Sequence, residues 1–148
     1  MDLMFLFGRI LIGLVFILAG IQVHLVARKQ SAEMARGVGV PFPDISVPLT
    51  GVVIIVGGLM VALGVWPDLA AILLILFLIS AAYFFHAFWR IEDPQEQGSQ
   101  TGHFMKNMGL VGASLIIFFV YNQLQGSAPL SLVGPLFGPI GSVFESPG

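Results

Sequence analysis

Long apolar stretches alternate with short polar connections along the chain. Four of these stretches are long enough to cross a bilayer as helices, which takes about 20 residues each. They cover residues 3–26, 47–65, 69–89 and 103–123. Residues 126–148 contain four prolines among glycines, so they cannot form a fifth spanning helix. The pattern predicts an all-α, four-transmembrane-helix bundle with short connections over residues 1–125, followed by a Pro/Gly-rich surface tail.

The composition places this chain in lipid. Of its 148 residues 57% are hydrophobic and only 9% are charged, which would leave a soluble domain with too little polar surface. A net charge of −2 without a basic cluster argues against a nucleic-acid partner. The chain has no cysteine, which excludes thiol–disulfide exchange, iron–sulfur clusters and cysteine zinc sites. A redox role would therefore need a bound cofactor or a partner.

Basic residues gather on one side of the predicted bundle. The loops 27–46 and 90–102 share that side, whose basic residues are Arg28, Lys29, Arg36, Arg90 and, at its edge, Lys106. The positive-inside rule places both loops in the cytoplasm and both termini outside. The first stretch is expected to stay attached rather than to act as a cleaved signal peptide, because no small-x-small cleavage site follows it.

All three histidines fall on the basic side. The topology brings His24, His86 and His103 to one membrane face, together with Lys106 and Asn107. No HExxH motif, paired carboxylates or i,i+4 histidine pair is present, so we expect no metal or haem. The set fits a hydrogen-bonding pocket for a quinone headgroup, whose tail stays in lipid, better than it fits a metal or haem site. The alternative is that these side chains anchor helix ends at the interface.

The ends of the third and fourth stretches define the central hypothesis. His86 ends one stretch, and Lys106 and Asn107 begin the next, so the short connection must bring them close together. Lys106 and Asn107 point about 100° apart on a helix, so at most one can aim squarely at His86. No Ser–His–Asp set, Cys–His pair or glycine-rich phosphate loop is apparent, and the catalytic residues, if any, remain unknown.

Arg9 lies about two helical turns inside the first stretch. A charge at that depth is unfavourable unless the side chain snorkels to the interface or meets a partner. Arg9 is therefore either a functional, ligand-binding candidate or a snorkelling anchor.

Small residues predict where the helices touch. Gly57 and Gly58, and Gly109 with Ala113, are spaced so that neighbouring backbones can approach closely. Leu74, in the most lipid-like stretch, is expected to face lipid.

Several short motifs follow one another in a characteristic order and spacing. They are Gly8-Arg9 with Gly13 and the FILAG of 16–20, GVPFP at 39–43, GGLMVALG at 57–64, HAFW at 86–89 and HFMKN at 103–107. Together they resemble the DoxX-like family of small integral membrane proteins. The resemblance covers almost the whole chain through Ser114. The resemblance implies a compact four-helix membrane protein. Some members are subunits of oxidoreductases such as thiosulfate:quinone oxidoreductase, or associate with them, which implies a quinone or redox partner by association.

Two positions depart from the family pattern. Many relatives have an acidic residue where this chain has Ile54, and a lysine where it has the 22–24 segment Gln-Val-His. Both differences weaken any proton or electron chemistry carried over from the family. Without the acidic residue Arg9 has no evident counter-ion within the membrane. The candidate partners on its own membrane face are Asp68, which is also placed to cap the third helix, Tyr121 and Asn122.

These observations predict an accessory or quinone-interacting subunit of an oxidoreductase assembly in a prokaryotic-type plasma membrane. Its partners would be the bilayer and other membrane subunits or a second copy of the chain. The alternative is a non-enzymatic structural or assembly subunit that packs against a larger membrane complex. A small-solute carrier is a third class, but broken helices and a midplane charged site are not visible. The ligand-binding candidates are His86, Lys106, Asn107, Arg9, His103 and His24.

Overall fold

The computed structural model describes residues 2–124 and 129–137, and its regular elements there are all helical. They are α1 (Asp2–Ala19), the π-helix η1 (Gly20–Val26), α2 (Arg28–Gly37), α3 (Pro43–Leu63), α4 (Pro67–Phe85), the 3-10 helix η2 (Phe88–Arg90) and α5 (Pro94–Leu124). Four segments are long and apolar enough to cross a membrane: Asp2–Val26, Pro43–Leu63, Pro67–Arg90 and Pro94–Leu124. The predicted all-α class is confirmed.

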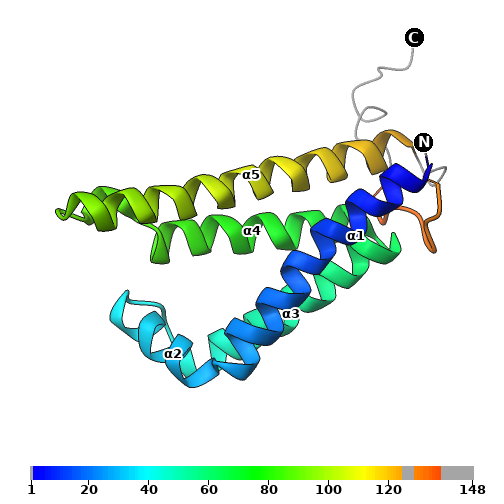
Figure 1. Ribbon diagram of the computed structural model, residues 1–148. Coiled ribbons are helices and arrows are strands. Elements are labelled where there is room, and N and C mark those ends of the chain that lie inside the picture. The colour runs from blue at the N-terminus through cyan, green and yellow to red at the C-terminus, as the bar shows by residue number, and fades with distance from the viewer. Residues whose placement is uncertain (1, 125–128, 138–148) are drawn as a thin grey trace, which may run out of the picture.

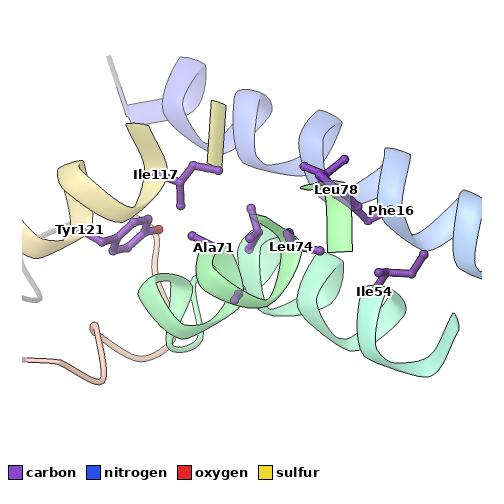
Figure 2. Packing of buried hydrophobic residues seen from close by; sticks show 9 residues of the cluster. Phe16, Ile54, Ala71, Leu74, Leu78, Ile117 and Tyr121 are labelled. Atoms are coloured by element: carbon purple, nitrogen blue, oxygen red, sulfur yellow. The ribbon is translucent and has the colours of Figure 1, made fainter. Parts of the chain in front are cut away.

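The four long helices form two antiparallel pairs, α1 with α3 and α4 with α5 (Figure 1). The pairs meet at the end that carries the N-terminus and the α3–α4 turn, which we call the joined end. They diverge toward the opposite end, which we call the splayed end, and α2 packs beside α3 there. A cluster of buried apolar side chains holds the pairs together (Figure 2). Its buried members are Phe16, Ile54, Val61, Ala70, Ala71, Leu74, Leu78, Ile117 and Tyr121.

Two of the expected helix contacts are present. A Cβ built on Gly58 would lie 2.6 Å from the carbonyl oxygen of Gly13, so the α1 and α3 backbones nearly touch. A Cβ on Gly57 would lie 3.1 Å from Leu74 Cδ2, which shows that the absent side chain makes room for that leucine. Close approach through glycines is the usual way in which membrane helices gain van der Waals contact.

Two other packing predictions are wrong. A Cβ on Gly109 would meet nothing within 4 Å, so this glycine makes no helix contact. Leu74 is fully buried rather than lipid-facing. Apolar residues serve equally well against lipid and against another helix, so hydropathy alone does not separate the two faces of a membrane helix.

The fourth spanning helix begins earlier than its apolar stretch. α5 starts at Pro94, so most of the predicted 90–102 connection is helical. Proline is favoured in the first helical position, and Asp93 Oδ1 accepts a hydrogen bond from the Glu96 amide at 2.8 Å, as a helix cap does. A helix of 31 residues is about 46 Å long, which exceeds the roughly 30 Å hydrocarbon core. The polar first turns of α5 therefore extend beyond the lipid.

The α3–α4 turn depends on Gly64. Its φ of 67° is in the left-handed region that glycine adopts readily. A Cβ there would also lie 2.5 Å from Arg9 Nη1 and 2.6 Å from Ser131 Oγ. Asp68 is not the N-cap residue of α4, because the helix already begins at Pro67, but its Oδ1 accepts a hydrogen bond from the first-turn amide of Leu69 at 2.9 Å.

Part of the predicted tail packs against the bundle itself. The amide groups of Leu132 and Val133 donate to the carbonyl oxygens of Leu63 and Gly64, both at 3.1 Å. Residues 129–137 thus cover the joined end, whereas the rest of the predicted 126–148 tail lies outside the described residues.

Candidate ligand cavity

A cavity of about 340 Å³ lies between the two helix pairs in their splayed half. Its volume falls within the range of about 300–1,000 Å³ that is typical of small-molecule sites. All five α-helices and the π-helix η1 contribute residues to its wall. The polar side chains in that wall are His24, Ser31, His86, Lys106 and Asn107.

The wall is polar at one end and apolar along its depth. On α4 it runs from Phe77 to Phe85, about 12 Å along the helix axis, and His86 follows directly. On α1 it includes Val15, well before the histidine of η1. The polar groups therefore lie toward the membrane edge and the apolar groups toward the bilayer interior. This arrangement suits an amphipathic ligand.

His24 is presented to the cavity by the π-helix η1. Its Nδ1 donates to the Val47 carbonyl oxygen at 3.1 Å, and its ring meets the edge of Phe77 at 5.7 Å between centroids. A Cβ on Gly51 would lie 2.5 Å from His24 Cβ, so this approach requires a glycine on α3. π-Helical turns occur often at functional sites. Only the ring Nε2 remains for a ligand.

His86 ends α4 and faces the same cavity. Its Nδ1 donates to Gln100 Oε1 at 2.8 Å. The ring stacks on His103, with centroids 5.1 Å apart and planes 20° from parallel. His103 itself is exposed and does not line the cavity. Two of the three histidines thus reach the site, and the third supports one of them from outside.

Asn107 is the buried polar group of the cavity wall. It is only 6% exposed, and its carboxamide has no hydrogen-bond partner among residues 2–124 and 129–137. Within these residues the polar atoms that are both fully buried and unpartnered are Arg9 Nε and Ser46 Oγ. The Asn107 amide and His24 Nε2 therefore keep some accessible surface, and the cavity is the space that they border.

Lys106 lies on the rim of the cavity. It is exposed, and the ion pair found in the described part of the chain joins Arg36 to Asp44 instead. Sequence connectivity predicted that His86 lies near Lys106 and Asn107, and all three side chains do line one cavity. Lys106 and Asn107 are adjacent on α5 and both line the cavity, because Asn107 points inward while Lys106 reaches the rim.

Comparison with protein families identifies the chain. A family model described as DoxX matches residues 4–87, which is more than half of the sequence. The chain belongs to the DoxX family. No curated protein and no solved structure gives a significant match. As a DoxX protein with four apolar helices, it is an integral membrane protein.

The matched region supplies only part of the cavity of this DoxX protein. It contains His24 and His86 and ends before α5 begins. Lys106 and Asn107 therefore lie outside the region that the family model describes. The chemistry of the site depends on both parts.

Arg9 lies at the other end of this DoxX protein. It is 1% exposed and donates to the Tyr121 hydroxyl, to Ser131 Oγ at 2.7 Å and to the Leu130 carbonyl oxygen at 2.7 Å. The Phe5 ring centroid lies 5.3 Å from its guanidinium carbon. The expected partner Tyr121 is present. Arg9 neither snorkels to the interface nor lines the cavity.

Asp68 anchors the same terminal segment separately from Arg9. It is fully buried and accepts hydrogen bonds from the amides of Leu136 at 2.9 Å and Phe137 at 2.6 Å. No ion pair links Asp68 to Arg9 within the described chain. Nothing in the sequence signals the contributions of Leu130 and Ser131, because a backbone carbonyl and a serine in a Pro/Gly-rich tail carry no pattern of their own.

Proposed function

We propose that this DoxX protein is an accessory, quinone-interacting subunit of a membrane oxidoreductase assembly, and that its cavity holds the quinone-type headgroup. The observation that carries the proposal is Asn107, a residue only 6% exposed whose carboxamide borders a largely apolar cavity and has no hydrogen-bond partner in the described chain. A polar group that loses its contact with water when a ligand binds costs about 1–3 kcal/mol unless the ligand supplies a hydrogen bond. A ligand that carries carbonyl or hydroxyl oxygens would satisfy this one.

The shape of the cavity supports the same ligand class. A flat ring with oxygen substituents can meet His24, His86 and Asn107 at the polar end, and an apolar tail can follow the wall past Phe77. The chain has no cysteine, so neither a thiol nor a cysteine-ligated cluster of its own can exchange electrons with the ring. The electron-transferring group would then belong to a partner subunit, which is why the proposed role is accessory.

Replacing Asn107 by leucine should reduce the quinone content of the purified protein several-fold, since one hydrogen bond is worth roughly a factor of 2–10 in affinity. The measurement is extraction and mass-spectrometric quantification of quinone after purification in mild detergent. Gln123→Leu is the matched control, because it also replaces an amide on α5 but lies exposed outside the cavity.

Equal quinone content in both variants and the wild type would contradict the proposal. A wild-type preparation that retains partner subunits but no quinone would favour the alternative, a structural or assembly subunit.

We also propose that the protein resides in a prokaryotic-type plasma membrane with the splayed end in the cytoplasm. The basic residues of α2 and the α4–α5 connection support this orientation through the positive-inside rule. Single cysteines introduced at Ser99 and Gln123, which are both exposed, test this orientation. The chain has no cysteine of its own, so no other site reacts with a thiol reagent. In intact cells an impermeant maleimide should label the Gln123→Cys variant and spare Ser99→Cys. The opposite labelling would reverse the orientation.

A further inference from the structure

We infer that the cavity binds the reduced, dihydroxy form of its quinone-type ligand more tightly than the dione, and that His24 Nε2 accepts a hydrogen bond from one of the hydroxyl groups. This inference rests on the proposed function and specifies the ligand of the same site. It follows from the hydrogen-bond partners of His24 and His86 and from the unpartnered carboxamide of Asn107.

The contact between His24 and Val47 fixes the ring tautomer of His24. A carbonyl oxygen can only accept, so the nitrogen that faces it across 3.1 Å, Nδ1, must carry the hydrogen. In a neutral imidazole the other nitrogen, Nε2, then has a lone pair and no hydrogen. His24 therefore offers the ligand an acceptor, not a donor.

The same reasoning applies to His86. Its Nδ1 lies 2.8 Å from Gln100 Oε1, and with this oxygen as its acceptor Nδ1 carries the hydrogen here too. The Nε2 of His86 is left as a second acceptor in the cavity wall. Two separate hydrogen bonds to protein oxygens thus hold both imidazoles in the same tautomer.

The two forms of the ligand would satisfy these groups differently. A dione has only acceptor oxygens, so it can take hydrogen bonds from the Asn107 amide and from Lys106 but leaves both imidazole nitrogens unpaired. A diol has two O–H donors as well as oxygen lone pairs, so it can donate to His24 or His86 and still accept from Asn107. Unpaired acceptors in an apolar site weaken binding, and this favours the diol.

Titration of the purified protein in detergent with decylubiquinol and with decylubiquinone tests the inference. The diol should bind roughly 3- to 10-fold more tightly, as expected for one or two additional hydrogen bonds. His24→Phe preserves the ring that meets Phe77 but removes Nε2, so it should lower the ratio of the two affinities to the part that His86 Nε2 still supplies. An unchanged ratio would show that His24 accepts no hydrogen bond from the diol. His103→Phe is the matched control and should leave the ratio unchanged, because His103 does not line the cavity.

Nitrogen-15 spectra of histidine-labelled wild-type protein provide a second test that does not depend on the folding of any variant. His24 should show the Nδ1–H tautomer, and its Nε2 resonance should shift on addition of decylubiquinol but much less with decylubiquinone. An Nε2–H tautomer, or equal affinity for both compounds, would overturn the inference and leave the proposed function intact. Failure of both compounds to bind would instead overturn the proposed function.

Discussion

Replacing Gly58 by alanine is expected to lower the apparent melting temperature in detergent by roughly 3–10 °C, the range that an overpacking penalty of about 1–3 kcal/mol would give. The added methyl group would sit 2.6 Å from the Gly13 carbonyl oxygen, which is too close for any real contact. The obstacle is backbone rather than a flexible side chain. The α1 and α3 helices would therefore have to separate along their whole interface.

Gly109→Ala provides the matched comparison for this effect. The same substitution on α5 places a methyl group where nothing lies within 4 Å, so the melting temperature should stay within a degree or two, as surface substitutions usually do. Thermal unfolding of both variants, followed by circular dichroism, makes the comparison. Similar losses of melting temperature in the two variants would show that the close approach of α1 and α3 is not the reason why Gly58 is needed.

Replacing Arg9 by leucine should release residues 129–137 from the joined end. The substitution removes the donor that serves Ser131 and the Leu130 carbonyl oxygen, and it leaves the Tyr121 hydroxyl without its cationic partner. Hydrogen bonds to charged groups contribute about 1.5–3 kcal/mol each, so the segment would lose much of its attachment. Hydrogen exchange followed by mass spectrometry should show faster exchange of the 129–137 amides.

Asp68→Leu tests the second anchor of that segment independently. It removes the acceptor of the Leu136 and Phe137 amides, so exchange should accelerate at these two positions before it does at Leu132 and Val133. Leu76→Ala, on the exposed face of α4, should leave the exchange of the segment unchanged. If the Arg9 and Asp68 variants protect residues 129–137 as well as the wild type does, the two anchors do not hold the segment.

The fold was predictable because a bilayer admits few kinds of spanning structure: every backbone polar group must find its hydrogen bond within the protein. Spans are set by length and apolarity, so the four helices could be located from the sequence. The start of α5 at Pro94 was missed because hydropathy marks where lipid ends and not where a helix ends. The Asp93–Pro94 pair was the available signal, since it has the features of a helix start.

The candidate site was predictable only as far as connectivity reaches. A short connection forces His86 toward Lys106 and Asn107, and the structure places all three in one cavity wall. The inclusion of His24 and the exclusion of His103 depend on the rotation of each helix about its axis. Rotation is set by side-chain packing, such as the space that Gly51 leaves for His24, and no periodic pattern in an all-apolar stretch reveals it.

Arg9 shows the same limit at the joined end. Its depth in the membrane identified it as a residue that needs partners, and Tyr121 was one of the candidates. The tail residues that complete its surroundings come from more than 120 positions away. Contacts over such a separation follow from the whole fold rather than from any local feature.

Photo-crosslinking with an azidoquinone is the most direct test of a quinone-type ligand in the cavity. The labelled peptides should contain His24, His86 or the Lys106–Asn107 pair, and excess decylubiquinol should abolish the labelling. Labelling confined to lipid-facing positions such as Ile116 and Phe119, and insensitive to the competitor, would contradict the account.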